Sequence, residues 1–227
     1  MNDSQRRGSV SRATSWESES VQLRVQPVLN QSNKLTAVEE EVLKGYISVE
    51  KEVLESKCYG PLQDALGCVA NTQCYITAGK RYLDGQAPDI SICLASSSVA
   101  HKLLCYGVIE VKRPSEPIDI SSHLGQVKDY ILSLMQAQPD RRRFWGFLTN
   151  MTENILIEIE RVDGTGMKRN IIKYAPMSWP AVINYLRDVT TREDLTPPPL
   201  HFAKELGNIE DIEEYKVEIG RLSCSGC

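Results

Sequence analysis

Two acids and a lysine stand at the ends of apolar runs in the middle of the chain. Asp89 opens the run Ile90–Leu94, while Glu110 and Lys112 close the run Leu103–Val111. Residues i and i+2 of a strand share a face, so the pattern predicts that Glu110 and Lys112 point the same way. If Ile90–Leu94 pairs beside the longer run, Asp89 reaches the same place. The sequence therefore predicts a cluster of charged side chains at one end of two neighbouring strands.

The chemistry that such a cluster supports is metal-assisted hydrolysis of a phosphodiester bond. Two carboxylates a few ångströms apart repel each other unless a cation lies between them, and oxygen ligands of this kind suit Mg²⁺ or Mn²⁺. A metal held by Asp89 and Glu110 would lower the pKa of a bound water and stabilise charge on the phosphate. Lys112 would orient that water or neutralise the developing charge.

Glu-x-Lys spacing occurs three times in the chain, at residues 55–57, 110–112 and 214–216. Only the middle copy ends an apolar strand pattern, and only it has a Pro-Asp pair in a neighbouring run. The alternative for Asp89 is an acid that caps a turn at a strand entry. The alternative for the middle glutamate and lysine is a cross-strand ion pair at a sheet edge, worth at most about 1 kcal/mol if exposed.

Hydrophobic spacing predicts the helices that must position these side chains. The first helical pattern starts after a capping box at Thr36 and Glu39. It predicts two helices, or one helix broken near Gly60-Pro61. The predicted helical segments are about 35–54, 61–67, 121–138 and 179–189.

Strand patterns alternate with these helices. The predicted strands are about 74–82, 90–94, 103–111, 144–149, 154–162 and a minor returning strand at 171–174. The order is one helical segment, three strands, a helix, two strands, the minor strand and a last helix. That order predicts an α/β sandwich with a central mixed sheet flanked by helices.

Composition divides the chain into three parts. Residues 1–33 are rich in Ser, Arg, Gln and Asn and are predicted to be a disordered tail. Within this tail Ser9 follows two arginines, as in targets of basophilic kinases; the alternative is a plain solvated tail. Residues 34–192 carry the helix and strand patterns and form the predicted domain. Residues 193–227 are predicted to be a linker, with three prolines at 197–199, followed by a short acidic segment and a truncated kinase-like lead-in.

The overall composition excludes several classes of protein. The chain is 41% hydrophobic and 25% charged with a net charge of -4, so a surface that binds nucleic acid must be local. The seven cysteines hold no pair of C-x-x-C motifs, and no histidine stands at metal-ligand spacing with a cysteine, which argues against zinc. Neither a signal peptide nor an apolar run of about 18 residues is present. We therefore expect an intracellular protein, in the nucleus or cytoplasm, with no membrane partner and no disulfides.

A family resemblance rests on the same central residues. Pro88-Asp89, followed across a hairpin-length gap by Glu110-Val111-Lys112, resembles the PD-(D/E)XK nuclease-like superfamily. The resemblance implies a restriction-endonuclease-like αβββαβ core, the order of elements predicted from residue 35 to about 150. It also implies an acid from the helix before the first strand, for which Glu55 is the candidate and Glu52 a lesser one. The helix after the lysine strand would supply a polar residue, Gln126.

A narrower resemblance covers more of the chain. Several segments look like the nuclease-like region that precedes kinase domains in fungal-type kinases and Crinkler-like effectors. These segments are 55–62, 86–92, 109–114, 126–131 and 142–149. Residues 215–222 look like the lead-in to a kinase Gly-rich loop, which implies a kinase domain in a longer chain. No lysine strand, catalytic loop or metal-binding aspartate motif follows, so kinase activity is not expected of this chain.

The sequence thus predicts a Mg²⁺- or Mn²⁺-dependent DNA endonuclease domain. The alternative is a catalytically inactive nuclease-fold module with an interaction or regulatory role next to a kinase. DNA is the expected partner if the domain is active. The sequence leaves open whether the protein forms a homodimer. Candidate phosphate contacts are Arg113, Lys128, Arg141, Arg142 and Arg143. For the three consecutive arginines, the alternative is a solvated turn between a helix and a strand.

Overall fold

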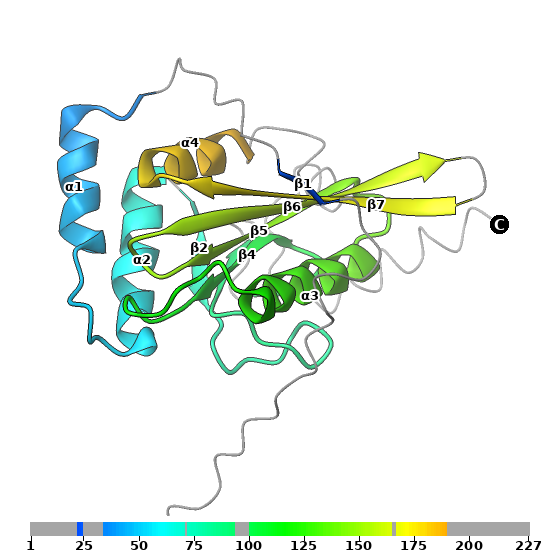
Figure 1. Cartoon of the computed structure of the whole chain (residues 1–227), viewed down its shortest axis with the longest axis horizontal. Coiled ribbons are helices and arrows are strands. Elements are labelled where there is room, and N and C mark those ends of the chain that lie inside the picture. Colours follow the sequence, from blue (N-terminus) through cyan, green and yellow to red (C-terminus); the bar gives the residue numbers. More distant parts are fainter. Residues whose placement is uncertain (1–21, 25–33, 71, 94–99, 165–166, 190–227) are drawn as a thin grey trace, which may run out of the picture.

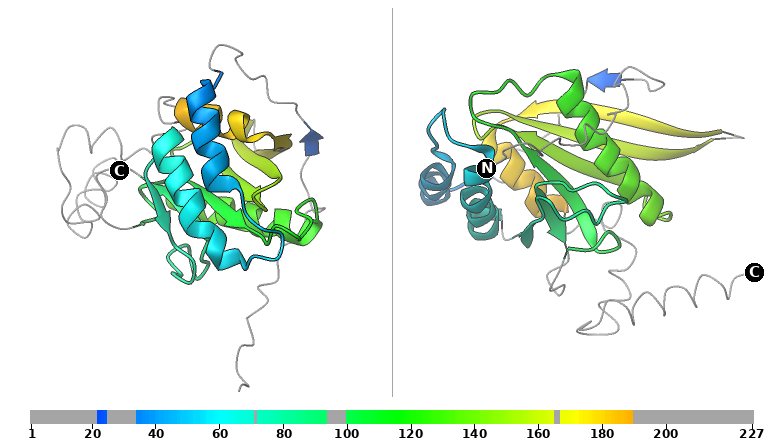
Figure 2. Two further views of the ribbon diagram at one scale, coloured as in Figure 1. Left: turned by 90° about the vertical axis from the view of Figure 1, so that its left-hand side faces the viewer. Right: turned by 90° about the horizontal axis from the view of Figure 1, so that it is seen from below.

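A mixed seven-stranded sheet forms the centre of the molecule, with helices on both faces (Figure 1). The computed structural model describes residues 22–24, 34–70, 72–93, 100–164 and 167–189. The strand order is β1-β7-β6-β5-β4-β3-β2. Helices α2 and α4 cover one face of the sheet, α3 covers the other, and α1 packs on the outside of α2 (Figure 2). The predicted class, an α/β fold with a mixed sheet between helices, is confirmed.

The helices are α1 (Ala37–Ile47), α2 (Glu55–Ala70), α3 (Ser121–Ala137) and α4 (Trp179–Val189). The strands are β1 (Gln22–Arg24), β2 (Cys74–Ile76), β3 (Ile90–Cys93), β4 (Cys105–Val111), β5 (Arg143–Thr149), β6 (Asn154–Gly164) and β7 (Met167–Met177). None of the helices in the described ranges combines the length and the apolar content needed to cross a membrane.

The first helical region forms two helices, but the break is not at Gly60-Pro61 as the sequence suggested. Helix α1 starts with the predicted capping box and ends before Ser48, whose ψ of 96° leaves the helical region. Helix α2 then runs through Pro61. A proline inside a helix removes one backbone hydrogen bond, but the buried stripe that includes Cys58 and Leu62 anchors this helix against the sheet. Tertiary packing therefore outweighs the local signal of the proline.

The strands that lead to the predicted cluster are buried on both faces. Every residue of β3 and β4 is buried, as expected for strands covered by helices on both sides. β3 pairs antiparallel with β4, and β4 pairs parallel with β5 after the crossover through α3. The close packing needs Gly107, because a Cβ there would lie 2.6 Å from the ring of Trp145. These pairings fix where the ends of β3 and β4 meet.

Other elements differ from the prediction in extent. β2 is shorter than the predicted 74–82, because the backbone N–H groups of Thr77 and Ala78 both donate to the carbonyl of Asp89 and turn the chain away. The minor returning strand is the long β7, which pairs with β6 along its whole length. Gln22–Arg24 lies inside the predicted tail, yet it pairs parallel with β7. Ser9 and the segment 215–222 lie outside the described residues.

Candidate active site

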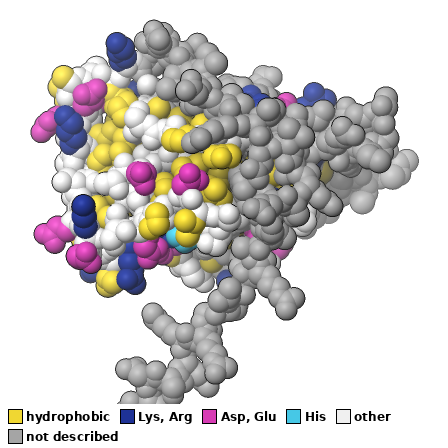
Figure 3. Space-filling model, viewed as in Figure 1, with side chains coloured by type: hydrophobic (Ala, Val, Ile, Leu, Met, Phe, Trp, Pro, Cys, Tyr) yellow, Lys and Arg dark blue, Asp and Glu magenta, His cyan; other side chains and the backbone are white. Residues whose placement is uncertain are grey.

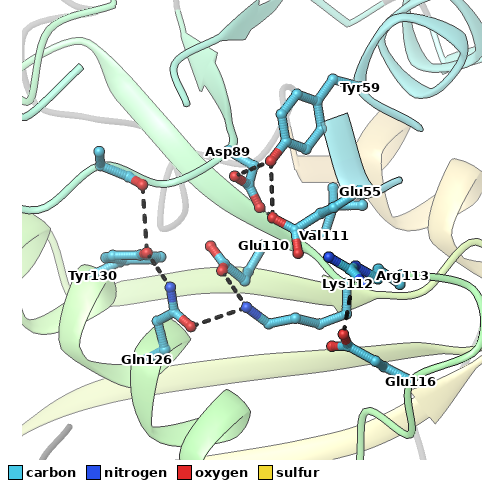
Figure 4. Close-up of polar contacts among 11 residues, drawn as sticks. Glu55, Tyr59, Asp89, Glu110, Val111, Lys112, Arg113, Glu116, Gln126 and Tyr130 are labelled. Carbon is cyan, nitrogen blue, oxygen red and sulfur yellow. Dashed lines mark hydrogen bonds and ion pairs between the residues drawn. The ribbon is translucent and has the colours of Figure 1, made fainter. Parts of the chain in front are cut away.

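Asp89 and Glu110 lie side by side because of the register between β3 and β4. Ile90 is opposite Ile109 in this antiparallel pair, so Asp89, one residue before β3, comes level with Glu110. The backbone N–H of Val111 donates to Oδ2 of Asp89 at 2.8 Å. Both carboxylates are buried, with Asp89 7% exposed and Glu110 3% exposed. Figure 4 shows them at the same end of the two strands.

Lys112 directs its ammonium back toward this pair. Its Nζ donates to Oε1 of Glu110 at 2.6 Å and to Oε1 of Gln126 at 3.1 Å. Its backbone N–H donates to the carbonyl of Thr149 at 2.7 Å, which continues the ladder between β4 and β5 and fixes where the side chain starts. The second oxygen of Glu110, Oε2, is buried and has no hydrogen-bond partner. Glu110 therefore retains an unused acceptor at the centre of the cluster.

Gln126 is oriented by a tyrosine that follows it by one helical turn. Nε2 of Gln126 donates to the hydroxyl oxygen of Tyr130 at 2.7 Å, and the Tyr130 hydroxyl donates to the carbonyl of Ala87 at 3.4 Å. Because the amide nitrogen of Gln126 can only donate, the phenol oxygen accepts from it, and Oε1 of Gln126 faces Lys112. Tyr130 was not among the site residues predicted from the sequence. Its spacing of four residues from Gln126 was the available signal.

Helix α2 contributes Glu55 and Tyr59 from the other side of the cluster. The hydroxyl of Tyr59 donates to Oδ1 of Asp89 at 2.7 Å and lies 3.0 Å from Oε1 of Glu55. The lesser candidate, Glu52, is exposed in the turn before α2. Glu55 is therefore the acid that the structure brings to the cluster. Tyr59 was missed by the sequence reasoning, although it follows Glu55 by four residues on the same helix face.

Burial and mutual repulsion raise the pKa values of the central carboxyl groups. The pKa of Glu110 rises to about 8, chiefly through burial and then through the charge of Asp89, while Lys112 opposes the shift. Burial also raises the pKa of Asp89 to about 6, against the hydrogen bonds from Val111 and Tyr59. For Lys112, burial lowers the pKa but the attraction of Glu110 and the other acids outweighs it, so the net shift is upward. The carboxyl groups of Glu110, Glu55 and Asp89 thus all act on the single ammonium of Lys112.

The donor set of this cluster fits a hard divalent cation. Asp89 and Glu110 offer oxygen ligands, and Oε2 of Glu110 is a buried acceptor without a partner. Among the described residues, no group of three or more His, Cys, Asp and Glu side chains has the arrangement of a metal site. Mg²⁺ is commonly held by one or two carboxylates together with waters and substrate phosphates. The two strand-end acids therefore suit Mg²⁺ or Mn²⁺ better than a metal that needs a full protein cage.

Two of the predicted phosphate contacts lie away from this cluster. Arg141 is 3% exposed, and its guanidinium donates to the carbonyls of Arg143, Cys105 and Tyr106. Lys128 is buried and lies two residues after Gln126, which is about 200° around helix α3 at 3.6 residues per turn. Arg141 uses its guanidinium for backbone contacts, and Lys128 is buried on another side of α3 from Gln126, so this placement does not support a role in binding phosphate.

The other three predicted contacts are more accessible. Arg113 is exposed directly after Lys112 and pairs with Glu116 at 3.8 Å. Arg142 is exposed next to Arg141, and Arg143 is half-buried against Glu158 at 3.3 Å. Of the five residues, Arg113 follows the cluster directly in the chain, and Figure 4 shows it beside Lys112. A role in DNA binding for Arg113, Arg142 and Arg143 stays a prediction.

Comparison with known proteins identifies no relative. No protein-family model, no curated protein and no solved structure matches this chain.

Proposed function

We propose that residues 34–192 form a nuclease domain with a restriction-endonuclease-like core, which hydrolyses phosphodiester bonds of DNA with Mg²⁺ or Mn²⁺. One observation carries the proposal. Asp89, Glu110 and Lys112 converge at the ends of β3 and β4, and Glu110 keeps a buried oxygen without a partner. A cross-strand ion pair at a sheet edge would need neither the second acid nor the unused oxygen.

The order and pairing of the elements support this core. From α2 to β5 the chain runs helix, three strands, helix, strand. β2, β3 and β4 pair antiparallel in sequence, and β5 returns parallel to β4 through α3. This is the αβββαβ order that the resemblance to PD-(D/E)XK proteins implies. The acids and the lysine stand at the ends of the second and third of these strands, as that motif requires.

Each side chain of the cluster has a role in the proposed reaction. Asp89 and Glu110 would hold the cation, which supplies a water of lowered pKa and neutralises charge on the phosphate. Lys112 would stabilise the negative charge that develops as water attacks phosphorus and the P–O bond breaks. Gln126, fixed by Tyr130, restricts where the Lys112 ammonium can lie. The cluster is thus organised before a substrate arrives, which lowers the cost of reaching the transition state.

DNA is the substrate class that the family resemblance implies. On the face drawn in Figure 3, Lys and Arg side chains are scattered among acidic ones rather than gathered in a patch. With a net charge of -4 the chain has no general attraction for a polyanion. Phosphate binding would therefore depend on the cation and on a few residues beside the cluster, such as Arg113.

The second candidate is an inactive module that has kept the fold and acts next to a kinase. It is favoured by the lack, within the described ranges, of a group of three or more metal-ligating side chains in the arrangement of a metal site. An acidic net charge is also unusual for a DNA-binding protein. The two candidates differ in one measurable property, because only the nuclease binds a divalent cation at Asp89 and Glu110.

Cleavage of a supercoiled circular DNA tests the proposal. The full chain should nick the circle with Mg²⁺ or Mn²⁺ and not with EDTA, and Glu110→Ala and Lys112→Ala should each reduce the rate at least about 100-fold. A matched control is the pair Glu160 and Lys173, a carboxylate–ammonium contact of 3.4 Å on β6 and β7. Glu160→Ala and Lys173→Ala should cleave like the unaltered protein.

The outcomes separate the candidates. Cleavage that persists in Glu110→Ala and Lys112→Ala would show that another site or a contaminant is responsible. A folded protein that neither cleaves nor binds Mn²⁺ would instead identify the inactive module.

A further inference from the structure

Two of the five cysteines that the structure describes lie opposite each other in the sheet, and both are free thiols. Cys93 is the last residue of β3, Cys105 is the first residue of β4, and the two are partners in the ladder. The register shifts between Ile92 and Cys93. Without this shift the ladder would place Tyr106 opposite Cys93. The bulge therefore brings the two thiols face to face.

The geometry of this pair fits a disulfide. Directly opposed residues of an antiparallel pair have Cα atoms about 4.5–5.5 Å apart, and a disulfide joins residues whose Cα atoms are about 4.4–6.8 Å apart. Both side chains pack in the core between the sheet and α3, and their thiols hydrogen-bond each other. A third buried cysteine, Cys74, packs in the core on the other face of the sheet and is opposite Ile92. An S–S bond between the opposed pair therefore needs little movement of the backbone.

The two thiols have different partners, which makes one of them the better nucleophile. Cys105 donates its S–H to the carbonyl of Gly107 at 3.2 Å, and the hydroxyl of Tyr82 lies 3.7 Å from its sulfur. Burial acts to raise the pKa of Cys105. The hydrogen bonds from Cys93 and Tyr82 and the charge of Arg141 outweigh burial, so the net shift of this pKa is downward. The pKa of Cys93 is raised by its hydrogen bond to Cys105 and then by burial. Cys105 is therefore the thiol that ionises first, and the thiolate is the reactive form.

We propose that Cys93 and Cys105 form a reversible redox pair, which a hydroperoxide converts to a disulfide that joins the end of β3 to the start of β4. The thiolate of Cys105 attacks the peroxide, the O–O bond breaks, and the alcohol leaves with a proton, or water leaves when the oxidant is hydrogen peroxide. The thiol of Cys93 then attacks the sulfenic acid of Cys105, the S–O bond breaks, and water leaves with the hydroxyl and the thiol proton. Two electrons thus pass from the two sulfurs to the peroxide. The reaction needs neither the metal nor the proposed nuclease activity.

Access to the two sulfurs should limit the rate of this reaction. Cys93 is 3% exposed and Cys105 is 0% exposed, so a peroxide has to enter by local opening. The pair is the terminal pair of its ladder, and the ladder between β2 and β3 ends at Ile92. The ends of elements open at a lower free energy than their centres. Oxidation of the pair should therefore be slower than that of the exposed Cys68, yet it should not require unfolding of the domain.

Peptide mapping of the full chain tests the inference. The folded protein is treated with hydrogen peroxide, the remaining thiols are blocked with N-ethylmaleimide, and the protein is digested with trypsin without reductant and analysed by mass spectrometry. Trypsin cuts after Arg81, Lys102 and Lys112, so the disulfide should link peptide 82–102 to peptide 103–112. Dithiothreitol should remove the link. The thermal midpoint of the oxidised protein should be about 5–10 °C higher than that of the reduced protein.

The matched control is Cys74, which is buried on the opposite face of the same sheet. Cys74→Ala should leave the link in place, whereas Cys93→Ala should abolish it. The map of the unaltered protein decides the matter even if a variant fails to fold. Absence of the linked peptides at a peroxide dose that fully oxidises Cys68 overturns the inference. A link that forms only in urea also overturns it, because the opposed thiols of the folded sheet would then play no part.

Discussion

The two ends of strand β4 bury opposite charges in different ways. Near its start, the guanidinium of Arg141 donates to the carbonyls of Cys105 and Tyr106 and to Oε1 of Gln138 at 3.0 Å. Near its end, Glu110 and two further carboxyl groups share the ammonium of Lys112. We refer to these as the arginine end and the acid end of β4.

The two ends differ in whether all of their buried polar groups have hydrogen-bond partners. At the arginine end, one cation meets the carbonyl oxygens that converge on it, and its ring neighbour Phe144 lies 4.5 Å below the guanidinium. At the acid end, acceptors outnumber donors, and Oε2 of Glu110 is buried without a partner. Buried polar groups are nearly always satisfied in folded proteins. The satisfied guanidinium of Arg141 fits a structural role, and the unpartnered oxygen of Glu110 is where the proposed cation would bind.

Loss of the buried guanidinium of Arg141 should give the largest change in stability. Arg141→Met removes the donors to three backbone carbonyls and leaves those oxygens buried, so the free energy of unfolding should fall by about 3–5 kcal/mol. Urea denaturation measures it. Mn²⁺ affinity of the folded variant should not change, because the acid end lies about five residues along the strand, or roughly 16 Å.

The control for this change is the neighbouring arginine. Arg142 is exposed, and Arg142→Met should alter the free energy of unfolding by no more than about 0.5 kcal/mol. Loss of Mn²⁺ affinity in Arg141→Met would contradict the independence of the two ends.

Removing the charge of Glu110 at the acid end should instead increase the free energy of unfolding. The pKa of Glu110 is about 8 in the folded protein, above its ordinary value of 4.5. Between these two pH values the folded protein keeps a proton that the unfolded chain has released, so stability falls as pH rises. Glu110→Gln removes this penalty and also the ion pair with Lys112. We expect a net gain of about 2 kcal/mol at pH 8 in EDTA, and little gain at pH 5.

Urea denaturation at several pH values between 5 and 8 measures this effect. The free energy of unfolding of the unaltered protein should decline across that range more steeply than that of Glu110→Gln. Equal slopes would show that Glu110 is ionised in both states, and the acid end would then resemble the arginine end in being fully satisfied.

The acid end could be predicted largely from the sequence because its parts are local. The apolar runs identified β3 and β4, and the two-residue period placed Glu110 and Lys112 on one face. Pairing of adjacent strands then brought Asp89 into the same place. Gln126 and Glu55 came from the family resemblance. The hydroxyls of Tyr59 and Tyr130 were missed, since a tyrosine on an apolar stripe looks the same in sequence whether or not its hydroxyl has a partner.

The arginine end could not be predicted in this way. Three consecutive arginines after a helix look like a solvated turn, and nothing local distinguishes Arg141 from Arg142. Arg141 is buried because the carbonyls of Cys105 and Tyr106, more than 30 residues earlier, converge on it. The helix break before α2 has a similar explanation, since the packing of α2 decides whether Pro61 interrupts the helix. Non-local packing decided each of these cases.

The smallest expected effect concerns DNA binding by the two exposed arginines. Arg113 follows Lys112 at the acid end, while Arg142 follows Arg141 at the arginine end. If substrate phosphates lie at the acid end, Arg113→Ala should weaken DNA binding a few-fold and reduce the salt dependence by about one phosphate contact. Arg142→Ala should change neither quantity. Fluorescence anisotropy of a labelled duplex across a salt series measures both, with Mg²⁺ present and with Lys112→Ala in every variant to prevent cleavage.

The pairing of Arg113 with Glu116 limits how large this effect can be. That ion pair is 3.8 Å long and exposed, so it is worth little, and a phosphate can compete for the guanidinium. Glu116→Ala should therefore leave DNA binding unchanged or slightly tighter. Equal losses in Arg113→Ala and Arg142→Ala would mean that DNA contacts both ends of β4. The unpaired oxygen of Glu110 would then not mark the place where the substrate lies.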